Sequence, residues 1–175
     1  MTFQVGDKVV HRSFGQGEVV QLDEKELGGK SQHYYVVEFP QLTLWVPVNG
    51  AEQGSLRLPV ERREFKKLYE VLRSPGEELV EDRFQRQVQL SERMREGSTE
   101  ELCRIIRDIS ARSVEHKLNE NDLSVLRHAQ SLLLDEWQFS QGISLEESRL
   151  QLENLLQESR EAAQLAQLAQ EDPPA

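Results

Sequence analysis

Histidines are the side chains of this chain best suited to bind a metal ion or to transfer protons near neutral pH. A metal site on a helix usually needs two histidines at positions i and i+4, because this spacing places both rings on one face. The chain has four histidines, and no two of them have this spacing: His11, His33, His116 and His128. The sequence therefore predicts no metal site.

Residues 28–31, GGKS, resemble the end of a phosphate-binding P-loop. The complete P-loop has a further glycine at the place of position 24, and a helix follows its serine, so that backbone amides surround the phosphates. In this chain position 24 is Glu24, and the residues after Ser31 favour a strand. We expect no nucleotide site here.

The cysteine and the carboxylates suggest no catalytic arrangement either. Cys103 is the only cysteine, and its neighbours Leu102 and Ile105 indicate a buried, structural thiol on a helix. Acidic residues are plentiful, but they fall on helix starts and solvent faces, and no general acid and base pair stands out. The sequence thus predicts a protein that is not an enzyme and that has no cofactor.

The composition is that of a globular protein with one medium or two small domains: 175 residues, 37% hydrophobic and 30% charged. No apolar run approaches the roughly 20 residues that cross a bilayer. The first residues also lack the basic and then apolar pattern of a signal peptide. We expect a cytoplasmic protein without a membrane partner.

The formal net charge of −10 opposes binding to the phosphates of free nucleic acid. The negative charge is concentrated towards the C-terminus, where residues 118–175 have three basic and eleven acidic side chains. Residues 62–117 have thirteen basic and twelve acidic ones. The central segment can therefore still present a basic face locally.

The first sixty residues alternate β-rich runs with turn residues. They predict strands at residues 9–11, 18–22, 32–39 and 42–47 and a fifth near Leu56 and Leu58, with residues 23–31 as a loop. Five short antiparallel strands must curl to bury a core, so we expect a Tudor-like or SH3-like β-barrel.

From about residue 60 the apolar period becomes helical. The first stripe consists of Phe65, Leu68, Tyr69 and Leu72 and stops at RSPG, residues 73–76. A second helix is predicted over residues 80–95, before Gly97. Capping boxes at residues 98–101 and 144–147 open the third and fifth helices. The fourth helix has an apolar stripe that consists of Leu126, Ala129, Leu133 and Trp137.

The predicted fold class is α+β, with a five-stranded barrel followed by an all-α domain of about five helices. The predicted divisions are residues 1–60 for the barrel, 61–160 for the helical domain and 161–175 for a low-complexity, frayed tail.

Four blocks of the sequence, in order, resemble the CarD/CdnL family of bacterial transcription regulators. They are FQVGDKVVHRSFGQGEVV, YYVVEF, LWVPVNGAEQGSLR and LYEVLRSP, and the resemblance covers about residues 3–160. It implies an N-terminal Tudor-like domain that binds the β subunit of RNA polymerase, as in the transcription-repair coupling factor. It also implies a helical domain that contacts promoter DNA at the upstream edge of the melted region.

Transferred position by position, the resemblance places the polymerase contacts on two short segments. The residues concerned are Lys25, Leu27, Trp45, Val46 and Pro47. Many family members have a basic residue at the position of Trp45. Leu42, Leu44 and Val46 alternate with Trp45, so Trp45 points outwards if the leucines point inwards, and it then suits an interface anchor. The alternative is that Trp45 fills the barrel.

In the family the second helix has a Trp that enters the minor groove, followed by basic residues. Counting back from Gly97, Arg83 takes the place of this Trp, with Phe84 beside it. The resemblance thus implies a DNA-binding set of Arg83, Phe84, Arg86 and Arg93. Its arginines lie within about 80° on one helix face. Phe84 also matches a stripe with Val80 and Val88, and on that ground we expect it in the core.

The leading hypothesis is a regulator of transcription initiation that docks on the polymerase β subunit and modulates the stability of the open promoter complex. Promoter DNA would be bound only within the polymerase complex, and the protein would be a monomer. The alternative is a polymerase-binding adaptor whose helical domain contacts another protein, which the acidic C-terminal end and the missing Trp favour. A small enzyme with an attached SH3-like domain is a third, weaker possibility.

Overall fold

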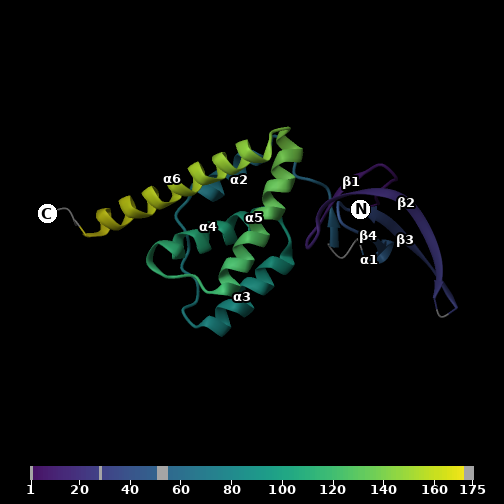
Figure 1. The fold of residues 1–175 in the computed structure, drawn as a ribbon, viewed down its shortest axis with the longest axis horizontal. Helices are drawn as coiled ribbons and strands as arrows, with labels where there is room; N and C mark the ends of the chain where they lie inside the picture. Colours follow the sequence, from purple (N-terminus) through teal and green to yellow (C-terminus); the bar gives the residue numbers. More distant parts are fainter. Residues whose placement is uncertain (1, 28, 51–54, 172–175) are drawn as a thin grey trace. The chain divides into compact units, whose positions relative to one another are not determined.

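The computed structural model of the chain describes residues 2–27, 29–50 and 55–171 (Figure 1). The chain divides into two compact units, an antiparallel sheet up to Pro59 and a set of helices from Val60 onwards. This order of an antiparallel sheet and an all-α unit confirms the predicted fold class.

The N-terminal unit is a five-stranded antiparallel sheet. Its strands lie in the order β4-β3-β2-β1-β5, so β4 and β5 form its two ends. The strands are β1 Lys8–His11, β2 Gly15–Leu27, β3 Lys30–Glu38, β4 Thr43–Pro47 and β5 Leu56–Arg57, and a short helix, α1 Val48–Gly50, follows β4.

The long pair β2 and β3 differs from the prediction. Residues 23–27 were expected in a loop, but they continue β2 and pair with β3 as far as Leu27 opposite Lys30. They are mostly polar, so no apolar alternation marks them in the sequence. Their strand conformation comes from the continued backbone ladder rather than from a buried face.

The core of the sheet unit consists of alternating residues from one face of the strands. The pairing of β2 with β3 shifts in register between Val19 and Gln21. Before the shift Val19 pairs with Val37, and after it Leu22 pairs with Tyr35. Gly17 is required here, because a side chain would meet the Phe39 ring 2.8 Å away. The buried cluster contains Phe3, Val9, Val19, Tyr35, Val37, Phe39, Val46 and Leu56.

Over its described residues, the C-terminal unit forms five helices. They are α2 Phe65–Arg73, α3 Arg83–Glu96, α4 Thr99–Glu115, α5 Glu120–Gln141 and α6 Leu145–Glu171. Within this unit α6 packs against α2, and its C-terminal end extends past the neighbouring helices (Figure 1). Residues 161–171, expected in a frayed tail, form the last turns of α6, and residues 172–175 lie outside the described part.

Both predicted capping boxes begin helices at the expected residues. Ser98 Oγ accepts a hydrogen bond from the Glu101 amide at 3.2 Å. Ser144 and Glu147 bond reciprocally, with the Ser144 amide donating to the Glu147 carboxylate at 2.9 Å. These bonds satisfy amides that a helix start leaves free.

The core of the helical unit contains the apolar stripes that were predicted for the first, third and fourth helices. Leu72 and Ile105 are fully buried, as are Leu133 and Trp137. Cys103 is fully buried as well, which confirms its expected helix position. The core thus places α4 and α5 at the centre of the unit.

Candidate functional sites

Strand β4 is an edge strand of the described sheet. It lies at one end of the sheet and, among the described strands, pairs with β3 alone. An end strand leaves every second amide and carbonyl without a strand partner, so an extended segment of another protein can pair with it.

The side chains of β4 alternate between the core and the outer face, as predicted. Val46 is buried, and Leu44 packs against the core. Trp45, opposite Val36 in the ladder, is 46% exposed. Trp45 therefore does not fill the barrel, and its indole is available at the surface.

Two charged residues of β2 hold the Trp45 indole in place. The indole Nε1–H donates a hydrogen bond to Asp23 Oδ2 at 3.2 Å. On the same outer face, Lys25 Nζ lies 4.2 Å from the centre of the ring, in a cation–π contact. An exposed side chain that is already oriented loses little entropy on binding, so this arrangement suits an interface anchor.

Of the five residues expected to bind polymerase, the structure brings Lys25 and Trp45 into contact. Pro47 ends β4 opposite Tyr34. Val46 is buried and can contribute only its backbone and its support of the strand. Leu27 ends β2, and its side chain lies outside the described part of the structure.

The first turn of α3 is an exposed surface with one large apolar side chain. Asp82 caps the helix by accepting a hydrogen bond from the Gln85 amide at 2.8 Å. Arg83 and Phe84 follow, and both are exposed, with Phe84 at 72%. The prediction that Phe84 lies in the core is therefore wrong. Val88, one turn later, is 43% exposed, so the expected apolar stripe is a surface feature.

Arg86 does not lie on a DNA-facing surface, which corrects its assignment. It is 5% exposed, and its Nε lies 3.1 Å from Asp122 Oδ2 on α5. Its Nη1 donates to the carbonyls of Val80 and Glu81, each at 2.8 Å. Two guanidinium nitrogens, Nε and Nη1, are thus engaged inside the helical unit.

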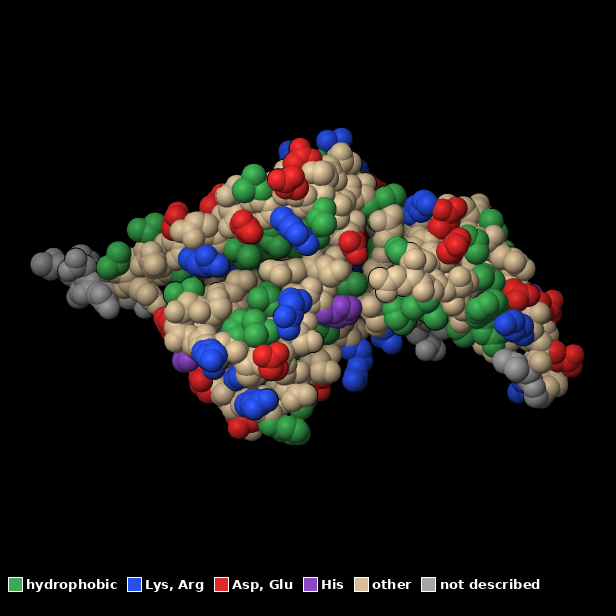
Figure 2. Space-filling model, in the orientation of Figure 1, with side chains coloured by type: hydrophobic (Ala, Val, Ile, Leu, Met, Phe, Trp, Pro, Cys, Tyr) green, Lys and Arg blue, Asp and Glu red, His purple; other side chains and the backbone are tan. Residues whose placement is uncertain are grey.

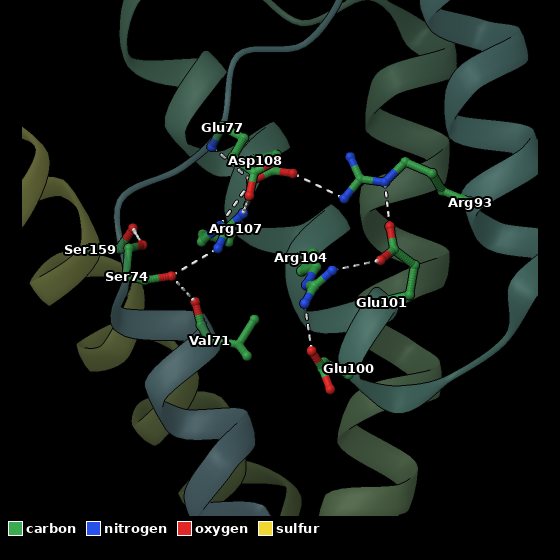
Figure 3. A network of polar contacts seen from close by, with 10 residues as sticks. All are labelled: Val71, Ser74, Glu77, Arg93, Glu100, Glu101, Arg104, Arg107, Asp108 and Ser159. Atoms are coloured by element: carbon green, nitrogen blue, oxygen red, sulfur yellow. Dashed lines mark hydrogen bonds and ion pairs between the residues drawn. The ribbon is translucent and has the colours of Figure 1, made fainter.

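Arg93 is also engaged within the unit and is partly buried, so its guanidinium is not free on the surface, and its assignment to DNA stays a prediction. Its guanidinium pairs with Glu101 and, at 3.0 Å, with Asp108 on α4 (Figure 3). These contacts raise the pKa of Arg93 against the effect of its burial. Of the three arginines proposed for DNA, Arg83 alone is exposed.

Asp108 is the centre of a polar network that the sequence analysis missed. Its side chain is fully buried and accepts hydrogen bonds from Arg93, Arg107 and the Glu77 amide (Figure 3). Arg107 Nη1 in turn donates to Ser74 Oγ at 2.8 Å. The network joins α3, α4 and the segment before α3. Its signal in the sequence was an acidic residue within the apolar stripe of α4.

The surface charge of the helical unit is mixed. On the face shown in Figure 2, basic and acidic side chains alternate over the helices, and no large basic patch is seen. Within the described residues no three or more His, Cys, Asp or Glu side chains are grouped to hold a metal ion. No helix among those residues is long and apolar enough to span a membrane.

Comparison with known proteins agrees with both units. Residues 3–61 match the CarD-like/TRCF RID domain, and residues 67–153 match the CarD C-terminal domain. The chain is 23% identical over 144 residues to the Bacillus subtilis (strain 168) protein named "Putative transcription factor YdeB", which covers 81% of this chain and 94% of that protein. With both domains matched in order over most of its length, the chain belongs to the CarD-like family of transcription factors.

Proposed function

We propose that the protein is a non-enzymatic regulator of transcription initiation in the cytoplasm. It docks on the β subunit of RNA polymerase through β4, and it contacts promoter DNA with the first turn of α3 once polymerase has brought it there. The observation on which this proposal chiefly depends is the exposure of Phe84 beside Arg83 at the start of α3.

The polymerase contact is supported by the properties of β4. Its free edge can pair with a strand of the β subunit, and the oriented Trp45 indole can fill a pocket beside that strand. Backbone pairing then supplies affinity, while Trp45 and Lys25 supply specificity.

The DNA contact is supported by the character of the first turn of α3. The family pattern has a Trp at the position of Arg83, and here the exposed aromatic ring stands one residue later, at Phe84. An apolar ring can enter between base steps of the minor groove, and a neighbouring arginine can contact phosphate or the groove. In this proposal Phe84 is the wedge and Arg83 its charged neighbour.

One observation favours the alternative of an adaptor. Arg86 and Arg93 are paired inside the unit, so the arginine face expected from the sequence does not exist on the surface. Phe84 and Val88 would then be an apolar surface for a protein partner rather than for DNA.

The lifetime of the open promoter complex on one promoter distinguishes a regulator that contacts DNA from an adaptor that contacts another protein. We expect Phe84→Ala to shorten the lifetime towards that of polymerase alone, and Arg83→Trp to lengthen it, because an indole at this place restores the family wedge. The matched control is Phe139→Ala on α5, which removes another exposed phenylalanine, 45% exposed. If neither Phe84→Ala nor Arg83→Trp changes the lifetime while the protein still binds polymerase, α3 does not contact DNA and the adaptor function replaces the proposed one.

A further inference from the structure

The first turn of α3 has one buried side chain of its own, while the segment before it is anchored by the core residue Leu79 and by an ion pair of Glu81 with Arg112. Residues 83, 84 and 85 are all exposed, and Arg86 is the first buried residue of the helix. The next buried one is Leu90, about 6 Å further along the helix axis. No apolar side chain of the first turn itself is buried, so the contacts of Arg86 are the ones that this turn makes with the interior.

Arg86 connects this turn to two other parts of the unit. Its Nε contacts both carboxylate oxygens of Asp122 on α5, at 3.3 and 3.1 Å. Its Nη1 bonds the carbonyls of residues 80 and 81, in the segment that leads into α3. A planar guanidinium can make these contacts at once because its donors point in fixed, different directions, whereas a lysine ammonium is a compact charge without this fork.

We propose that Arg86 is the positioning residue for Phe84. By joining the entry segment, the first turn of α3 and α5, it sets the direction in which the Phe84 ring leaves the surface. Arg86 itself, being 5% exposed, makes no DNA contact. This inference rests on the proposed function, because the position of Phe84 matters only if Phe84 acts on DNA.

Removing Arg86 alone would leave the buried Asp122 carboxylate without its partner and could unfold the unit. The test therefore uses the double variant Arg86→Met with Asp122→Asn, which removes both charges at similar volume. Arg104→Met with Glu100→Gln is the control, because it removes an exposed ion pair of 2.6 Å on α4.

The experiment is a cycle of open-complex lifetimes for the wild type, Phe84→Ala, the Arg86 and Asp122 double variant, and the triple variant. Amide hydrogen exchange of α3 and α4 is measured on the same proteins. We expect the double variant to shorten the open-complex lifetime by at least half as much as Phe84→Ala does. Amide exchange should be faster in residues 83–88 and unchanged in α4. In the triple variant we expect no further loss beyond Phe84→Ala, because Arg86 acts through Phe84.

Each contrary result has a distinct meaning. Additive losses in the triple variant, or unchanged exchange in residues 83–88, overturn the positioning role and leave the proposed function standing. An unchanged lifetime for Phe84→Ala overturns the wedge role of Phe84 and the positioning role of Arg86 together, and if Arg83→Trp has no effect either, the DNA contact of α3 is overturned as well. A loss of the same size in the Arg104 and Glu100 control would also overturn the positioning role, since any lost ion pair would then suffice.

Discussion

The ammonium group of Lys25 lies 4.2 Å from the centre of the Trp45 ring, across the outer face of the sheet. The same indole donates its Nε1–H to Asp23, so that one exposed aromatic side chain has two fixed polar neighbours. Such a ring is oriented before any partner arrives, and it stands on the strand whose free edge is open to pairing.

We therefore expect Trp45→Ala to weaken binding of the full chain to the polymerase β subunit by about 2 kcal/mol, or about 30-fold in Kd. Lys25→Met should have a smaller effect, because it removes the charge beside the ring and leaves the indole. Binding isotherms measure both, with Leu58→Ala as control, since Leu58 is 48% exposed in the same unit. An unchanged Kd for a folded Trp45→Ala protein would show that the indole lies outside the interface.

The free protein should bind duplex DNA with a Kd weaker than about 1 μM at physiological salt. Its net charge is −10, and Arg86 and Arg93 are paired internally, so few counterions can be released from DNA. Fluorescence anisotropy with a labelled duplex measures this affinity. Submicromolar binding without polymerase would instead indicate an autonomous DNA-binding protein.

Asp108→Asn should lower the free energy of unfolding of the helical unit by about 3 kcal/mol. The substitution keeps the shape of the side chain but removes the negative charge shared by Arg93 and Arg107, which leaves two largely buried cations undercompensated. Denaturant unfolding followed by helical circular dichroism measures the change. Glu78→Gln is the control, because Glu78 is an exposed carboxylate. Equal unfolding midpoints for the two variants would show that the network contributes little to stability.

The Cys103 thiol should react very slowly with a disulfide reagent such as DTNB in the native protein and rapidly in denaturant. It is fully buried, and burial raises the pKa of the thiol far above its usual range, so almost no thiolate is present at neutral pH. Val114→Cys provides the comparison, since Val114 is 61% exposed on the same helix and the new thiol should react at once. Rapid reaction of native Cys103 would reveal frequent opening of α4 and contradict a closed core.

Local sequence determined most of the elements and their caps. Ser98 and Ser144 begin helices because a serine followed three residues later by a glutamate can satisfy free amides at a helix start, a contact within four residues. The outward direction of Trp45 was also predictable, because successive strand residues point to opposite faces and Val46 belongs to the core.

Only the tertiary structure decided which face of α3 is buried. α3 has two apolar pairs at helical spacing, Phe84 with Val88 and Leu90 with Met94. The helix packs the second pair against the core, together with Arg86. The same face carries two arginines that pair with carboxylates buried in other helices. Arg93 pairs with Asp108, 15 residues later, and Arg86 pairs with Asp122, 36 residues later. A buried carboxylate needs charged or hydrogen-bonding partners, so these pairs favour the same face of α3 that Leu90 buries. The sequence by itself thus determined where α3 forms. The packing of Leu90 and the carboxylates of α4 and α5 together left Phe84 on the surface, because these contacts join residues far apart in the chain.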